Sequence, residues 1–201
     1  MKTMIKQSLL LITTLILSGC SFMSPVKLEP ETGYIIDTVP NVAKSHRHAA
    51  TLLIMQPDTN PIYNTTRIAF ANKPFQISYY SRSHWIEAPA DMLAAVLAQT
   101  MQKTNHFKSV IAPPFSGLYT YALRTQIKTL QADYTRPMPA MQVTIQAQIV
   151  RAGDGRIIAA REFKTAVPLQ KYSPFGAVVA ANCATSQLLS EMAVWCVRYT
   201  H

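Results

Sequence analysis

The residues best suited to chemistry lie in one short stretch, SYYSRSHWIEAP, between Ser78 and Pro89. His84 and Glu87 are three residues apart there, at the expected junction of a strand and a helix, and could form an acid–base pair. No nucleophile or oxyanion-binding group stands beside them in the sequence. Alternation along the strand instead predicts that Trp85 packs in the core. The sequence therefore favours a structural junction over a catalytic site, although partners from distant segments stay open.

The same junction carries signals for the start of a helix. Glu87 lies in the turn before the helix, where a negative charge interacts favourably with the helix N-terminus. Pro89 opens the helix, a position where its missing amide costs no hydrogen bond. We therefore assign Glu87 and Pro89 structural roles.

Other motifs of common enzymes are missing from the sequence. It has no Gly-x4-Gly-Lys-Ser/Thr loop, so the chain is not itself a P-loop ATPase. It also has neither the Gly-x-Ser-x-Gly elbow of serine hydrolases nor a His-Glu-x-x-His zinc motif. His46 and His48 could bind a metal, but the cationic Arg47 between them argues against it. We expect a solvated loop there, with no metal site and no bound cofactor.

The N-terminus has the features of a bacterial lipoprotein signal. Lys2 and Lys6 precede an apolar run at residues 8–17, which is shorter than the ~20 residues that a bilayer span needs. The following Leu17-Ser18-Gly19-Cys20 resembles a lipobox. This resemblance implies cleavage before Cys20, a diacylglycerol on its thiol, and a further acyl chain such as palmitate on its amine. The membrane is thus a predicted partner, through this covalent lipid.

The chain divides into three predicted parts. Residues 1–19 are the signal peptide, 20–33 the lipidated N-terminus with a short tether, and 34–201 a single domain. Ser21, in place of an Asp, favours the outer membrane over the inner one in this class of signal. The net charge is +9, but the basic residues are scattered, so we expect weak attraction to anionic headgroups and no binding of nucleic acid.

Hydrophobic periodicity predicts an α+β fold. A largely antiparallel or mixed sheet should carry two main helices packed on one face, because period-2 alternation is clear at 119–130 and 141–149 and helical spacing at 89–105 and after Pro174. Further strands are expected at 34–39, 50–56, 66–72, 75–81, 107–112 and 156–167.

Two cysteines fall in the last predicted helix. Helical geometry separates Cys183 from Cys196 by ~20 Å, too far for a disulfide, which needs Cα atoms within ~7 Å. We expect both to be buried, inert thiols.

Several residues together resemble one protein family. A strand ending in Tyr79 and Tyr80, then Arg82, Trp85, Glu87 and Pro89 before an amphipathic helix, is similar to the ABC-type transport auxiliary lipoproteins, which include the paraquat-inducible protein C group. The usual R-W-x-E-x-P becomes R-S-H-W-I-E-A-P here, with His84 at the position where the basic residue is expected and Arg82 two residues earlier. The resemblance continues at 121, at 157–163 and in the last helix with Trp195, and covers roughly residues 34 to 198.

The resemblance implies a non-enzymatic accessory of an ABC transporter or MCE-domain system that moves lipids or hydrophobic compounds between membranes. The implied partners are an MCE-domain protein, an ABC permease complex, or both, and self-association is open. Trp195 takes a structural role, and the candidate contacts to partner or cargo are Tyr79, Tyr80, Arg82, His84 and Trp85. Two alternatives remain: an activator of a cell-wall synthesis enzyme, which a longer tether would favour, and a lipoprotein hydrolase.

Overall fold

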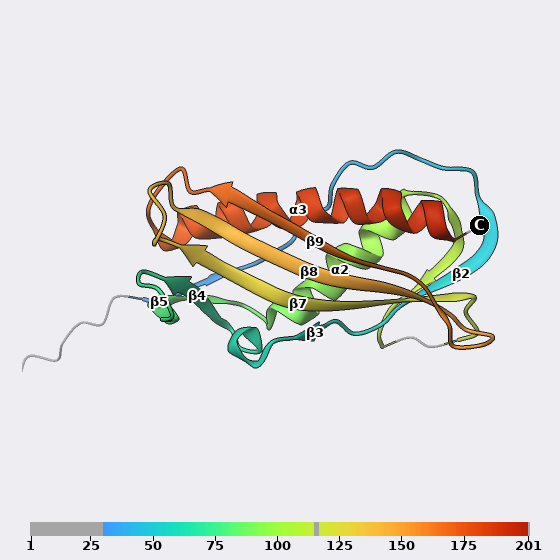
Figure 1. The fold of residues 1–201 in the computed structure, drawn as a ribbon, viewed down its shortest axis with the longest axis horizontal. Coiled ribbons are helices and arrows are strands. Elements are labelled where there is room, and N and C mark those ends of the chain that lie inside the picture. Colours follow the sequence, from blue (N-terminus) through green and yellow to red (C-terminus); the bar gives the residue numbers. More distant parts are fainter. Residues whose placement is uncertain (1–29, 115–116, 201) are drawn as a thin grey trace, which may run out of the picture. The chain divides into compact units, whose positions relative to one another are not determined.

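The computed structural model describes residues 30–114 and 117–200 (Figure 1). Apart from Pro30, these residues belong to one compact unit that begins at Glu31. The predicted signal peptide, Cys20 and the tether as far as residue 29 lie outside the described residues. Within the described ranges, neither helix combines the length and the apolar character needed to cross a bilayer.

The sheet is built around its longest strand, β7 (Tyr121–Asp133). On one edge, β7 pairs antiparallel with β8 (Ala140–Arg151), which pairs in turn with β9 (Ile157–Pro168). The other edge of β7 pairs with three parallel strands in succession: β2 (His48–Ile54), β3 (Asp58–Thr59) and β4 (Arg67–Ala71). One long strand therefore joins the two halves of the sheet.

Three further strands and a short helical turn complete the sheet layer. They are β5 (Ser78–Trp85), antiparallel to β4; β1 (Thr32–Tyr34), parallel to β5; β6 (Phe107–Ile111), parallel to β2; and the 3-10 turn η2 (Pro61–Tyr63).

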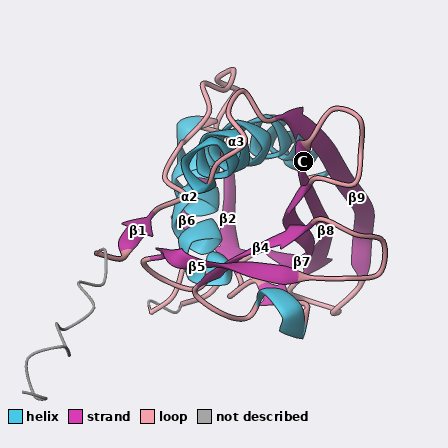
Figure 2. Ribbon diagram, turned by 90° about the vertical axis from the view of Figure 1, so that its left-hand side faces the viewer, coloured by secondary structure: helices cyan, strands magenta, loops and turns pink. Residues whose placement is uncertain are grey.

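Two helices fill the inside of the curled sheet (Figure 2). They are α2 (Pro89–Lys103), which packs on β2 and β6, and α3 (Pro174–Tyr199), which packs on β8 and β9. Their apolar faces meet the inner residues of the strands, and Leu52, Leu97, Leu123, Ile149 and Leu188 are fully buried. The predicted α+β class, with a mixed sheet and two helices, is confirmed.

The strand predicted at 34–39 was wrong, because β1 ends at Tyr34 and the chain continues without regular structure to residue 47. The backbone of this segment bonds to a side chain of α3 instead of to a strand. The amides of Asp37 and Thr38 donate to Asn182 Oδ1 at 3.1 and 3.3 Å. Asn182 Nδ2 donates in turn to the carbonyl oxygen of Ile35 at 2.9 Å. One amide side chain therefore replaces a strand partner.

Both cysteines lie in α3 as predicted, and both are free thiols. Burial raises the pKa of the Cys196 thiol well above its ordinary value, so this group stays protonated. Cys183, however, is exposed, which corrects the expectation of a buried thiol. The reason is its position in the stripe of Val179, Cys183 and Gln187, which faces outward at helical spacing.

Candidate functional site

Trp85 lies at the centre of the junction that the sequence singled out. Its side chain is 1% exposed, so it contributes to the core and not to the surface. Backbone bonds hold the junction on both sides: Trp85 N donates to Thr66 O at 2.6 Å, and Ile86 N donates to Tyr34 O at 2.8 Å. The end of β5 is thus fixed between β1 and the start of β4.

Part of this stretch borders an open cavity with a volume of about 630 Å³, which is lined by Tyr79, Tyr80, Ser81, Ser83 and His84. Tyr79 and His84 line it together with Arg67 and Glu31. The guanidinium carbon of Arg67 lies 3.9 Å from the centre of the Tyr79 ring, and the Tyr79 hydroxyl donates to Ile62 O at 3.0 Å. The cavity therefore combines an aromatic ring with charged groups of both signs.

His84 and Glu87 are not brought together. His84 Nδ1 lies 3.7 Å from Glu31 Oε2, and within the described part of the chain His84 forms no ion pair with Glu87. Glu87 is exposed just before Ala88, the residue that caps α2, and Pro89 is the first residue of that helix. The acid–base pair that the spacing allowed is therefore not assembled.

Tyr80 belongs to an aromatic cluster formed by Phe70, Tyr80, Tyr134 and Tyr172. Tyr80 stacks on Phe70 with ring centres 4.7 Å apart, and its hydroxyl shares a hydrogen bond of 2.6 Å with that of Tyr134. Tyr172 meets Tyr134 edge-on at 6.4 Å. Burial is the main cause that raises the pKa of Tyr80 well above its ordinary value, so the phenol stays neutral.

Arg82 and Trp195, the remaining residues singled out by sequence, lie on different layers. Arg82 is exposed on β5, beside the cavity residues Ser81 and Ser83. Trp195 is buried in α3 and packs edge-on against Phe163 of β9, with ring centres 5.5 Å apart. Trp195 thus helps to hold α3 on the sheet.

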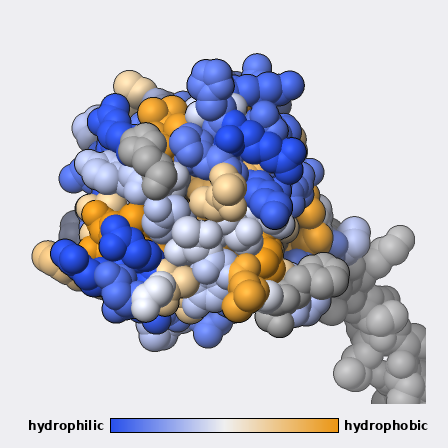
Figure 3. All heavy atoms as spheres, turned by 90° about the vertical axis from the view of Figure 1, so that its right-hand side faces the viewer, coloured by the Kyte–Doolittle hydropathy of each residue, from blue (hydrophilic) through white to orange (hydrophobic). Residues whose placement is uncertain are grey.

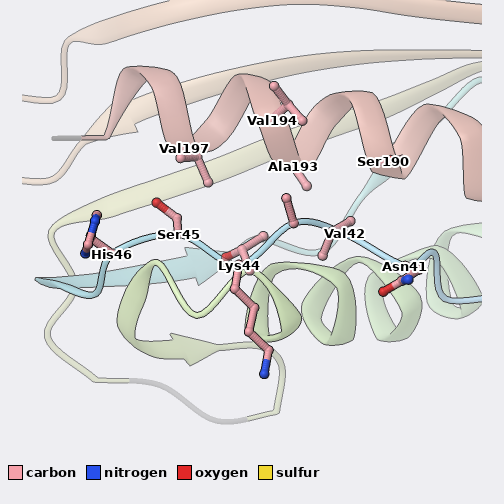
Figure 4. A pocket seen from close by; sticks show the side chains of 11 residues that line it. Asn41, Val42, Lys44, Ser45, His46, Ser190, Ala193, Val194 and Val197 are labelled. Carbon is pink, nitrogen blue, oxygen red and sulfur yellow. The ribbon is translucent and has the colours of Figure 1, made fainter.

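A second hollow, which the sequence did not indicate, lies between the irregular segment 41–46 and α3 (Figure 4). Its volume is about 710 Å³, and Val42, Ala193 and Val197 contribute apolar side chains to it. The helical spacing predicted after Pro174 does not reveal what lies against this part of α3. This hollow has an apolar floor and no cluster of reactive groups.

Three histidines also lie in this region of the domain: His46, His48 and His106. His46 is exposed in the irregular segment, whereas His48 begins β2, and its ring centre lies 4.5 Å from that of His106. His106, which the sequence analysis did not single out, is buried, with Nε2 3.0 Å from Thr200 O. Across residues 30–114 and 117–200, no group of three or more His, Cys, Asp or Glu side chains is placed to hold a metal ion.

Comparisons with known proteins identify relatives of this fold. A family model described as ABC-type transport auxiliary lipoprotein component matches residues 34–193. The crystal structure of a DUF330 protein from Xanthomonas campestris is similar, with a TM-score of 0.74 and 19% identity over 86% of this chain and 96% of that one. The crystal structure of an uncharacterized protein gives a TM-score of 0.67 and 12% identity, over 84% and 99% of the two chains. Comparison with curated proteins gives no match.

Proposed function

The chain belongs to the family of ABC-type transport auxiliary lipoprotein components, and we propose that it serves as a non-enzymatic accessory of an ABC or MCE-type system. That system would move lipids or other hydrophobic compounds between the inner and outer membranes. The observation that carries the proposal is the family match, which extends over nearly all of the described residues. The resemblance recognised in the sequence is confirmed by this match.

We place the protein on the periplasmic side of the outer membrane, held by lipid on Cys20. The support is the lipobox-like Leu17-Ser18-Gly19-Cys20 and the Ser21 that follows it. Two or more acyl chains hold a protein firmly on a bilayer, whereas one chain holds it only marginally. From Cys20 to Pro30 the chain reaches at most about 35 Å, at ~3.5 Å per residue. The domain would therefore work close to the membrane that anchors it.

The outer face of β5 supports binding better than catalysis. His84 is paired with Glu31 instead of Glu87, so no acid–base pair is in place. The Tyr79 ring under Arg67 and the exposed Arg82 offer a mixed aromatic and cationic surface, of the kind that is enriched at protein interfaces. We propose Tyr79 and Arg82 as the main contacts to a partner subunit, with Tyr80 and His84 at the edge of that surface, where their loss would cost little binding.

Deletion genetics tests the pathway. Deleting this protein should weaken the envelope barrier to detergents and hydrophobic toxins, as should deleting the MCE or permease subunit of its system. The double deletion should be no worse than either single deletion. Clearly additive phenotypes would separate the protein from transport, and crosslinked membranes that yield cell-wall synthases in place of MCE or ABC subunits would support the activator alternative.

Two variants test the site. His84→Ala with Glu87→Ala should complement the deletion almost fully, because the two residues do not work as an acid–base pair. If this variant is stable and correctly localised but fails to complement the deletion, the result would support a catalytic role for His84 and Glu87. Arg82→Glu should reduce crosslinking to the partner subunit, whereas Lys128→Glu, an exposed charge on β7, is the matched control.

A further inference from the structure

Three loops meet at the end of the sheet where β7 stops. They are residues 72–77 between β4 and β5, 134–139 between β7 and β8, and 169–173 between β9 and α3. Backbone bonds join them at their bases: Tyr134 N donates to Ala71 O at 2.7 Å, and Leu169 N donates to Pro139 O at 2.9 Å. We call this surface, formed by the three loops and the first turn of α3, the loop end; it lies at the left of Figure 1.

Each loop presents one large apolar side chain to solvent. Phe75 is 110% exposed, Tyr172 68% and Met138 64%, and Phe175 in the first turn of α3 is exposed beside them. Phe75 also has a φ of 64°, a left-handed conformation that costs energy for a residue other than glycine. The Phe75 ring gains no core packing in return. This strained display of an aromatic side chain points to a contact outside the domain.

The charges of the loop end have one sign. The three loops contain Lys73, Arg136 and Lys171 and no acidic residue. Arg136 is paired with Asp133 at the base of its loop, with Nε 2.9 Å from Oδ2. Lys73 and Lys171 are exposed and form no ion pair with any residue that the structure describes. Exposed aromatic and basic side chains together suit an anionic lipid headgroup layer, into which rings insert and above which lysines lie.

The direction of β1 relates it to the same end of the sheet. β5 begins at Ser78, at the loop end, and runs away from it. β1 is parallel to β5, with Thr32 opposite Ser83, so β1 also runs away from the loop end. Tyr34 then lies against Phe175, with ring centres 6.3 Å apart. The first residue of β1 is therefore oriented toward the end that carries the exposed rings.

The opposite end of the sheet has a different surface. It includes the turn between β8 and β9, where Arg151 faces Asp154 at 3.5 Å. Figure 3 shows hydrophilic groups there, interrupted by separate apolar ones. Two apolar side chains are exposed at that end, Leu118 just before β7 at 98% and Ile157 at the start of β9 at 54%. The two ends thus supply a test surface and a matched control within one chain.

We propose that the loop end is a membrane-contacting surface: Phe75, Met138 and Tyr172 enter the headgroup layer of an anionic bilayer, with Lys73 and Lys171 against its phosphates. The proposal rests on the proposed lipidation of Cys20, which would hold the domain within reach of that bilayer. The contact would fix which face of the domain points away from the membrane toward its partners.

Fluorescence quenching tests the contact. The mature, lipidated protein carrying Phe75→Trp is reconstituted into vesicles of phosphatidylethanolamine and phosphatidylglycerol that contain a lipid brominated near the headgroup. The tryptophan at position 75 should lose most of its emission, while Leu118→Trp should keep it. Trp85 and Trp195 are buried and give the same background in both variants. Equal quenching of the two variants, or no quenching of either, overturns the proposal.

A charge variant tests the role of the lysines. In the Phe75→Trp protein, Lys73→Gln with Lys171→Gln should reduce the quenching in vesicles with phosphatidylglycerol, whereas Lys108→Gln with Lys128→Gln should leave it unchanged. An equal effect of the two pairs contradicts a specific headgroup contact. If position 75 is shielded only when a purified transport subunit is added, the surface binds protein and the proposal fails.

The mass of the mature N-terminal peptide distinguishes failure of the proposed lipid anchor from failure of the proposed membrane contact. A peptide without acyl chains contradicts the proposed anchor itself. With acylated Cys20 established, unquenched Phe75→Trp contradicts the loop-end contact alone and leaves the proposed function intact.

Discussion

Asp133, at the end of β7, shows how a mostly buried carboxylate is kept charged. Burial raises its pKa, but hydrogen bonds from Thr135 and Arg136 outweigh this, so the pKa of Asp133 lies below its ordinary value. Thr135 donates from its amide at 2.9 Å and its hydroxyl at 2.6 Å, and Gln142 Nε2 donates at 2.7 Å. The carboxylate thereby organises the base of the 134–139 loop.

The lowered pKa of Asp133 predicts acid sensitivity. A carboxylate with a folded-state pKa below the unfolded one stabilises the fold above the unfolded pKa of ~3.9, and this contribution is lost as pH falls through the folded pKa. Asp133→Asn should lower the free energy of unfolding by about 1–3 kcal/mol at neutral pH, because an amide keeps only one of the two charged oxygens that accept hydrogen bonds from Thr135, Arg136 and Gln142. Urea unfolding at pH 7 and in acid measures this, and a deficit that fails to shrink in acid contradicts it.

Trp85 carries the second prediction at this scale. Trp85→Ala should lower the free energy of unfolding by about 3–5 kcal/mol, because a large, fully packed side chain is removed from the core. Leu118→Ala, at an exposed position, should change it by less than about 0.5 kcal/mol. Thermal melts of the two variants make the comparison. An unchanged melting temperature for Trp85→Ala would mean that the ring is not packed as described.

Among the elements, the irregular segment after β1 depends on α3. Asn182→Ala removes the acceptor of two backbone amides and the donor to Ile35. We expect hydrogen exchange at the Asp37 and Thr38 amides to rise sharply. The β7 amides should stay protected, since their hydrogen bonds do not involve Asn182. Gln187→Ala, which changes an exposed amide side chain of the same helix, should leave the exchange at both positions unchanged. Equal exchange in the two variants would show that other groups hold the segment.

The elements also show where sequence patterns succeed. The alternation at 119–130 and 141–149 predicted β7 and β8, because one face of each is buried and the other is not. Helical spacing and Pro89 predicted α2, whose first residue is that proline. The prediction for residues 34–39 was wrong because their apolar pattern reflects packing on both helices, and a distant asparagine satisfies part of the backbone. The predicted burial of Cys183 was wrong because the apolar character of a residue does not tell which side of a helix is covered.

At the scale of the whole molecule, sequence reasoning reached the family and the fold class but not the surfaces. The stretch from Ser78 to Pro89 was singled out correctly as a junction, but its His84 faces Glu31, a neighbour from another segment. The loop end was invisible in the sequence, because Phe75, Met138 and Tyr172 come from loops far apart in the chain. Only the register of β4, β7, β8 and β9 brings them together.

The prediction at the scale of the whole molecule is that lipid on Cys20 anchors the protein to a membrane. Cys20→Ala should block lipid transfer, so the precursor should accumulate uncleaved and the acylated mature form should be missing. Cell fractionation with detection of the processed form measures this. Cys183→Ala, at the exposed thiol of α3, is the control and should mature normally. A Cys20→Ala protein that matures and stays membrane-bound would contradict lipidation.

The position of β7 has a consequence for the order of folding. β2, β3 and β4 precede β7 in the chain, yet each takes β7 as a neighbour in the sheet. If the chain is exported with its N-terminus first, as the predicted signal peptide implies, these strands emerge long before their partner does. The first half of the domain therefore stays without its central strand, and remains accessible to periplasmic chaperones, until Asp133 has cleared the translocation channel.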